Sequence, residues 1–361
     1  MKIKLFDPHV GKAEENAVKK ILHSKSWASG AGGGNVLEFE KEFSSYIKCK
    51  NSIAVNSATA ALNLALSIID IKNKDVIVPS LTFVSTANAI LINGGNPIFA
   101  DVNPITLCID KKTIEEKISP KTKLILPVHF GGLACDMSNI KKIAQKHNLT
   151  IIDDAAHAAG TKFKGKKIGS ENFASCFSFH PVKNLAMPNG GMITLNHKEF
   201  RKFTKILLEK RWCGIKDRTF SGYDVSNLGN NYYMNEFSAA IGRIQLRKLD
   251  KLNKIRLKIA KIYDKELNCQ QKMPYDKECS YHLYWIRIKN RNVFRKILAR
   301  ENIETGIHYP PVHNFSLYNK KNNLKLPVTD TIADQIVTIP IHPNLTDSQI
   351  DKIIKTVNRN I

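Results

Sequence analysis

The sequence lacks the cysteine patterns that define disulfide-stapled or metal-binding proteins. Its seven cysteines are an odd number, lie far apart and form no Cys-x-x-Cys pair, so we expect reduced thiols that behave as small, mostly buried apolar residues. No His-Glu-x-x-His motif and no Cys/His cluster with zinc spacing is present, and His308 and His313 lie in a proline-rich turn at a poor ligand spacing. The sequence therefore implies no metal site.

Long apolar runs are also missing. The first residues, MKIKLFDPHVGKAEEN, contain acids and a proline where a secretory signal has its apolar stretch, and no later run approaches the roughly 20 residues that span a bilayer. We therefore expect a soluble, cytoplasmic protein without a membrane partner. With 361 residues, 43% of them hydrophobic, the chain is long enough to form one large domain and a smaller one.

Acidic residues are scarce: 32 Asp and Glu stand against 55 Lys and Arg, which gives a formal net charge of +23. Such a charge attracts polyanions, so binding to nucleic acid or to a membrane surface has to be considered. The excess lysines, however, are spread along the chain, and stretches such as KLDKLNKIRLKIAKIYDKEL place them on the solvated faces of amphipathic helices. We expect no nucleic-acid partner, since a small anionic substrate benefits equally from this charge.

Between about residues 50 and 195, short β-rich runs alternate with segments of helical period. The predicted strands are SIAVNS, DVIVPS, PIFADV, KLILPVHF, TIIDDA, ASCFSFH and GGMITL, with helices from Ala58 and from about Thr82. This alternation predicts an α/β fold with a mostly parallel central sheet and helices on both faces. The run GGMITL follows a glycine pair and is expected to return as an antiparallel strand.

After Asn235 the pattern changes to long helices that reach about Leu267, followed by the strand YHLYWIRI and the terminal helix SQIDKIIKTVNRNI. We therefore predict a large domain over residues 1–245 and a small α+β domain over residues 246–361. Because no flexible linker separates them, the two domains are expected to share an interface. The glycine-rich GAGGGN at residues 30–35 follows no strand and lacks the lysine of a P-loop, so a mobile loop is expected there.

Residues just past the predicted strands form one chemical set, because ligands of open α/β sheets bind outside the carboxyl ends of the strands. Ala58 and Thr59 begin a helix whose free amides and dipole can hold a phosphate. Phe83 can lie flat on a heterocycle, Asp154 can pair with a protonated ring nitrogen, and Lys183 can form an imine with an aldehyde. Each has an ordinary structural explanation alone, but together they supply what pyridoxal 5′-phosphate needs.

Several motifs resemble those of the DegT/DnrJ/EryC1/StrS family of sugar aminotransferases, within fold type I of the pyridoxal-phosphate enzymes. They extend over nearly the whole chain and stand in the family's order: SKSWASG, VNSATAALNLAL, VPSLTFVSTANAILINGGNPIFADV, IIDDAAHAAGTKFKGKKIG, CFSFHPVKN, NNYYMNEFSAAIGRIQL, HYPPVH and IHPNLTDSQI. The resemblance implies the fold type I architecture, with a large cofactor-binding domain and a smaller C-terminal one.

The resemblance also implies roles for single residues. Lys183 matches the lysine that carries the cofactor as an imine, and Asp154 matches the acid on the pyridine nitrogen. His157 stands where the family has Gln or His near the ring hydroxyl, and Phe83 where an aromatic ring covers the cofactor. The phosphate contacts match Ala58, Thr59 and Ser178.

Two further matches concern the partner subunit and the substrate. Asn231 matches an asparagine that reaches the phosphate from the neighbouring subunit, which implies a homodimer with shared active sites. His308 and Tyr309 match the family's segment near the substrate. The sequence departs from the family at AMPNGG after the lysine, at Tyr233, where the family has Arg, and at Ala58, where Gly is common. These departures leave the cofactor set intact and put the substrate in doubt.

The resemblance implies transfer of an amino group from glutamate or glutamine to a nucleotide-linked keto-deoxysugar, a step of amino-sugar and polysaccharide biosynthesis. One alternative is removal of a sugar hydroxyl on the same scaffold, but family dehydratases replace the imine lysine with histidine and this chain keeps Lys183. Another is a non-catalytic, regulatory or polyanion-binding relative that has retained the fold, because a fold does not establish a function.

Overall fold

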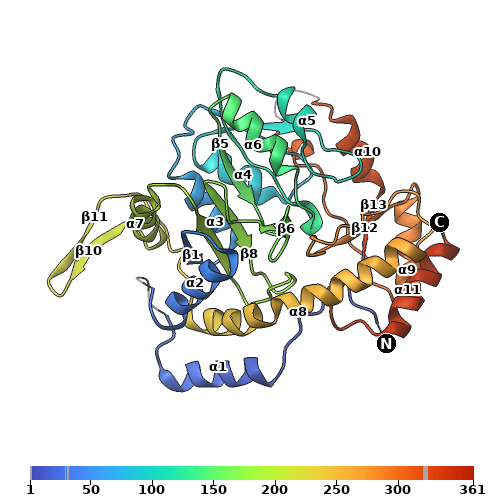
Figure 1. Cartoon of the computed structure of the whole chain (residues 1–361), viewed down its shortest axis with the longest axis horizontal. Coiled ribbons are helices and arrows are strands. Elements are labelled where there is room, and N and C mark those ends of the chain that lie inside the picture. The colour runs from blue at the N-terminus through green and yellow to red at the C-terminus, as the bar shows by residue number, and fades with distance from the viewer. Residues whose placement is uncertain (1, 29, 31, 320–323) are drawn as a thin grey trace.

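The computed structural model describes residues 2–28, 30, 32–319 and 324–361 (Figure 1). Its centre is a seven-stranded sheet in the order β1-β9-β8-β5-β4-β2-β3. The strands are β1 (Asn51–Val55), β2 (Asp75–Pro79), β3 (Asn96–Ala100), β4 (Thr122–Ile125), β5 (Thr150–Asp154), β8 (Ala174–Ser178) and β9 (Gly191–Leu195). All seven coincide with the runs predicted from the sequence.

Strand direction also follows the prediction. The neighbours β8, β5, β4, β2 and β3 pair in parallel, whereas β9 pairs antiparallel with both β8 and β1. The reversed strand is the run after the glycine pair, because it follows β8 through a short connection and no crossover helix. The parallel strands therefore bring their carboxyl ends to one edge of the sheet, and the residues that follow them gather there.

Helices cover both faces of the sheet, as the apolar strands predicted. Along β2, Val76 and Val78 point into one hydrophobic cluster and Ile77 into another, so alternate residues face two separate cores. The core that contains Ile77 includes residues of α2 (Gly34–Ile47), α5 (Lys111–Glu115), α6 (Met137–Lys146) and α8 (Glu236–Glu266). The core that contains Val76 and Val78 includes residues of α3 (Ala58–Leu66), α4 (Val84–Ile92) and α7 (Phe200–Arg211).

The C-terminal part contains a two-stranded antiparallel sheet and three helices. These elements are β12 (Tyr284–Arg287), β13 (Ile336–Ile339), α9 (Arg291–Arg300), α10 (Pro327–Gln335) and α11 (Asp347–Arg359). Ile3, at the other end of the chain, pairs with Ile303, so the two termini lie near each other (Figure 1). Helix α8 crosses the predicted domain boundary at residues 245 and 246 without a break, and the boundary itself stays a prediction.

A β-hairpin projects from the side of the molecule next to α7 (Figure 1). It consists of β10 (Ile215–Thr219) and β11 (Gly222–Val225), and it exposes Phe220, Tyr223 and Val225 to solvent. Exposed apolar residues on a projecting hairpin favour a protein partner. The remaining elements are α1 (Lys12–Ser24), the 3-10 turns η1 (Phe130–Gly132) and η2 (Val312–Asn314), and the small hairpin β6 (Lys162–Phe163) and β7 (Lys166–Lys167).

The cysteines and the helix lengths can be compared with the sequence predictions. All seven cysteines are free thiols, and five of them are buried, as expected for small apolar residues. Cys213 is the exposed one. Among the described residues, no helix is both long enough and apolar enough to cross a membrane.

Candidate active site

A pocket of about 310 Å³ opens at the carboxyl ends of the parallel strands. Its walls come from the turn before α3, the start of α4 and the segments after β5 and β8. Eight of the residues singled out from the sequence line it: Ala58, Thr59, Phe83, Asp154, His157, Ser178, Lys183 and Tyr309. Residues separated by more than 200 positions in the sequence therefore meet in one site.

Lys183 and Asp154 set the electrostatics of this pocket. Burial lowers the pKa of the Lys183 amine to about 8, although the nearby Asp154 carboxylate favours the charged form. Burial likewise raises the pKa of Asp154, while hydrogen bonds from Thr86 and from the Ala156 amide, and the charge of Lys183, act in the opposite direction. An amine with a pKa near 8 is partly neutral at physiological pH and can act as a nucleophile.

Two hydrogen bonds hold the Asp154 carboxylate in place. The hydroxyl of Thr86 donates to Asp154 Oδ2 at 2.8 Å, and the backbone N–H of Ala156 donates to Oδ1 at 3.0 Å. Thr82 Oγ1 lies 2.9 Å from Thr86 Oγ1, so its hydroxyl can support the first contact. Asp154 is 5% exposed and faces the pocket, which suits it to hold a positive charge on a bound heterocycle.

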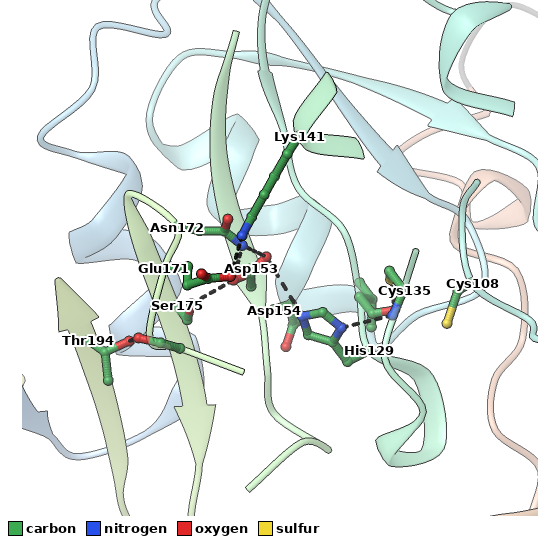
Figure 2. A network of polar contacts seen from close by, with 12 residues as sticks. Cys108, His129, Cys135, Lys141, Asp153, Asp154, Glu171, Asn172, Ser175 and Thr194 are labelled. Atoms are coloured by element: carbon green, nitrogen blue, oxygen red, sulfur yellow. Dashed lines mark hydrogen bonds and ion pairs between the residues drawn. The ribbon is translucent and has the colours of Figure 1, made fainter. Parts of the chain in front are cut away.

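The neighbouring acid, Asp153, is also buried but belongs to a separate network (Figure 2). Its carboxylate accepts hydrogen bonds from Asn172 and from the Ser175 hydroxyl, the latter at 2.6 Å. His129 Nε2 lies 3.7 Å from Asp153 Oδ1, and His129 Nδ1 accepts the backbone N–H of Cys135. Because successive strand residues point to opposite faces, Asp153 stabilises the sheet while Asp154 faces the pocket.

Removal of the Thr86 hydroxyl tests this description of Asp154. Because that hydrogen bond stabilises the ionised carboxylate, Thr86→Val is expected to raise the pKa of Asp154 further. The acidic limb of the pH–rate profile should move upward, so that activity falls more at pH 5 than at pH 8. Thr86→Ser keeps a hydroxyl and should follow the wild-type profile, whereas parallel profiles for all three proteins would contradict the assignment.

The start of α3 provides donors for an anion. The Ser57 hydroxyl caps the helix by accepting the N–H of Ala60 at 3.1 Å, and the Ser57 carbonyl accepts that of Ala61. Within the described chain, the amides of Ala58 and Thr59 have no such partner, and both residues line the pocket. Free amides at a helix N-terminus bind phosphate.

A close approach of two backbones builds this corner of the pocket. The backbone at Gly190 and Gly191, where β9 begins, bridges to Ser57. A Cβ at Gly191 would lie 2.5 Å from the Ser57 backbone, so only glycine fits there. The departure AMPNGG thus keeps the glycine pair that the phosphate corner requires.

Aromatic and imidazole rings complete the walls. Phe83 is 56% exposed and lies 5.9 Å from the Tyr309 ring, so its face is available to a flat ligand. His157 Nδ1 accepts the Gly131 amide at 3.2 Å, which leaves Nε2 as the donor toward the Tyr309 hydroxyl at 3.1 Å. Burial lowers the pKa of His157 well below its usual range, so the ring is neutral.

Two predicted site residues lie outside the pocket wall. The side chain of His308 bonds to Thr338 at 2.9 Å instead, and burial lowers its pKa to about 4. Asn231 is exposed beside the pocket, where its carbonyl accepts from Asn56, a residue of the pocket wall. The chain therefore does not bring the Asn231 side chain into its own pocket.

Sequence reasoning missed four residues that shape the site. Ser57 and Thr86 could have been found, because each stands next to a predicted site residue or one helical turn from it. Asn189 lies in the glycine segment and accepts a hydrogen bond from Ser238. His282 contacts Lys183 across 99 positions, and no local signal indicates it.

The pocket offers each group that pyridoxal phosphate needs: free helix amides, a ring-covering aromatic, a fixed carboxylate and a deep amine. With the sheet topology, these features define a pyridoxal-phosphate-dependent aminotransferase. Comparison with known proteins agrees, since the chain belongs to the DegT/DnrJ/EryC1/StrS aminotransferase family, whose profile matches residues 8–358.

Relatives and solved structures resemble the chain over almost its full length. The spore coat polysaccharide biosynthesis protein SpsC of Bacillus subtilis is 36% identical, with 97% of this chain and 95% of that protein covered. Helicobacter pylori PseC, an aminotransferase involved in the biosynthesis of pseudoaminic acid, superposes with a TM-score of 0.92 at 27% identity, covering 99% of both chains. The PLP form of the putative sugar aminotransferase Spr1654 from Streptococcus pneumoniae gives 0.93 at 26% identity, covering 99% and 98%.

Proposed function

We propose that the chain transfers an amino group from glutamate or glutamine to a nucleotide-linked keto-deoxysugar. The observation that carries this proposal is the shared pocket of the Lys183 amine, the Asp154 carboxylate and the free amides of α3. The names of SpsC and PseC, which refer to polysaccharide and pseudoaminic acid biosynthesis, support a sugar as acceptor. A diphosphate-linked sugar also suits a chain of net charge +23.

In this proposal, separate residues of the chain bind the cofactor and transfer the proton. Bound pyridoxal phosphate supplies an electron sink, provided that its ring nitrogen stays protonated. Asp154 holds that proton, the α3 amides and Ser178 bind the phosphate, and Phe83 covers the ring. Lys183, as a free amine, would take the proton from the α-carbon of the amino donor and return it in the reverse step, because its lowered pKa lets it both accept and release protons near neutral pH.

A screen of nucleotide keto-sugars tests the acceptor. Protein loaded with pyridoxamine phosphate is expected to regain the visible absorbance band of its lysine-linked cofactor only when a suitable keto-sugar is added. The matching sugar product should carry the nitrogen, as mass spectrometry would show. If simple keto acids restore the band and no nucleotide keto-sugar does, the proposed acceptor class is wrong.

The active sites are proposed to be shared within a homodimer. The projecting β10–β11 hairpin, which precedes Asn231 in the chain, exposes apolar residues, and Asn231 does not line the pocket of its own chain. Asn231 is therefore free to contact the phosphate in a second copy.

The cytoplasmic location also stays a prediction, and it is consistent with seven free cysteines.

Mixing of two inactive variants tests the shared sites. Lys183→Ala and Asn231→Ala subunits, mixed in equal amounts and allowed to exchange, should regain about one quarter of the wild-type activity, because half of the dimers then contain one intact site. The control mixture of Lys183→Ala with Asp154→Asn should stay inactive, because both residues come from the same subunit. If the two mixtures regain equal activity, or if neither regains any, the proposal that Asn231 of a second copy completes each site is wrong.

A further inference from the structure

A histidine outside every predicted motif touches the Lys183 amine. His282 Nε2 lies 3.3 Å from Lys183 Nζ, and His282 is 3% exposed. Its ring stacks on Phe6 with centroids 5.6 Å apart, and the His157 ring lies 4.5 Å away. The imidazole is therefore fixed between two rings, with one nitrogen directed at the reacting amine.

The contact determines the tautomer of His282. A protonated amine has only donors, so His282 Nε2 has to accept and the ring proton has to sit on Nδ1. Burial, followed by the positive charge of Lys183, lowers the pKa of His282 well below its usual range, so the ring stays neutral. Among the described residues, the buried Nδ1 atom has no hydrogen-bond partner. A buried N–H in this position calls for an acceptor.

A small cavity behind Lys183 is lined by His282, Arg256 and His342. Its volume of about 10 Å³ suits one water molecule. Arg256 Nη1 and His342 Nδ1 are also buried without partners in the part of the chain that the structure describes. Arg256 is 6% exposed, and no described carboxylate pairs with it. Three residues that each have an unsatisfied buried polar atom therefore line one water-sized space.

The donors and acceptors of these groups favour water over an anion. His342 Nε2 lies 3.1 Å from the Lys4 carbonyl oxygen and has to donate to it, which leaves a lone pair on His342 Nδ1. Arg256 and His282 each offer an N–H. A water molecule can accept from these two and donate to His342, whereas an anion would face the lone pair of His342.

We propose that His282 is a catalytic residue that accepts a hydrogen bond from the protonated Lys183 amine, and that a buried water held by Arg256 and His342 fixes its tautomer. The proposal rests on the proton-transfer role proposed for Lys183 and not on the identity of the acceptor. His282 stabilises the amine while it holds a proton and fixes its position. No bond to His282 forms or breaks.

Other ionisable groups also face Lys183 or His282, so the effect of His282 has to be separated from theirs. Asp154 favours the protonated amine from the end of β5. The remaining groups that act on these two residues are His157, His180, His308 and Arg256. The variants tested below retain all of these groups, so a change in the pKa of Lys183 can be assigned to position 282.

The test measures the pKa of Lys183 directly in the full-length chain freed of cofactor. Trace labelling with acetic anhydride over a range of pH, followed by mass spectrometry of the Lys183 peptide, gives the midpoint at which the amine loses its proton; about 8 is expected for the wild type. His282→Phe should lower this midpoint by about one pH unit, because the acceptor for the charged amine is lost. His282→Gln places an amide oxygen near the Nε2 position and should keep the wild-type midpoint.

Two results would overturn the proposal. A folded His282→Phe chain with an unchanged midpoint would remove the role of His282, and a high-resolution crystal structure without a water in the cavity would remove the tautomer argument. If the phenylalanine variant does not fold, His282→Asn, whose side chain is too short to reach Lys183 Nζ, takes its place. The labelling experiment involves no sugar. It can therefore succeed or fail independently of the keto-sugar screen that tests the proposed acceptor.

Discussion

Lys183→Ala is expected to abolish amino-group transfer, with a loss of at least about 10⁴-fold, because we propose that this one side chain both attaches the cofactor and moves the proton. The visible absorbance band of the lysine-linked cofactor should disappear, and borohydride should no longer fix the cofactor to the protein. Stopped-flow absorbance and mass spectrometry of the reduced protein check both outcomes.

A surface lysine provides the matched control for this experiment. Lys265→Ala removes an exposed lysine near the end of α8 and should leave the band and the rate unchanged. Exogenous small amines should restore part of the rate of Lys183→Ala, since they can replace the missing base in the space left by the side chain. Retention of a borohydride-fixed cofactor in Lys183→Ala would assign the attachment to a different lysine.

Asp154→Asn is expected to bind the cofactor but to slow both half-reactions by about 10²- to 10³-fold, because the isosteric amide cannot hold the proton on the ring nitrogen. The hydrogen bonds from Thr86 and from the Ala156 amide hold the carboxylate in this position. Single-turnover rates with the amino donor, measured separately from cofactor affinity, check the prediction.

The adjacent acid is an unusually close control for this variant. Asp153→Asn lies one residue away, is equally buried and points to the opposite face, where it bonds to Asn172 and Ser175 (Figure 2). It should cost about 1–3 kcal/mol of stability through lost hydrogen bonds, measured by chemical denaturation, and leave the single-turnover rates within a few-fold. Equal rate losses in the two variants would mean that Asp154 acts through the fold and not on the cofactor.

The sheet and half of the pocket could be predicted from the sequence because the signals are local. Short β-rich runs indicated each strand, and the rule that ligands bind at strand ends brought Ala58, Phe83, Asp154 and Lys183 to one edge. The antiparallel direction of β9 followed from the glycine pair before it. Each of these inferences needed only residues that are neighbours in the sequence.

The remaining contacts depend on packing between distant segments, which periodicity does not encode. His282 reaches Lys183 because the C-terminal part folds against the sheet, and His308 bonds to Thr338 instead of lining the pocket wall. Asn231 lies outside the pocket wall of its own chain, so the role proposed for it depends on a second copy. These contacts between distant segments become visible only in the folded structure.

Helix α8 limits how the protein can move. Its 31 residues form one rod of about 46 Å, to which both parts of the molecule are fastened. Ser238 near its start holds Asn189 of the pocket wall, Arg256 lies behind the Lys183 amine, and Tyr263 near its end donates to the Pro340 carbonyl. A swing of the C-terminal part about position 245 would have to break this rod. We therefore expect a substrate to enter by rearrangement of surface loops, with the spacing between Lys183 and Arg256 kept by this helix.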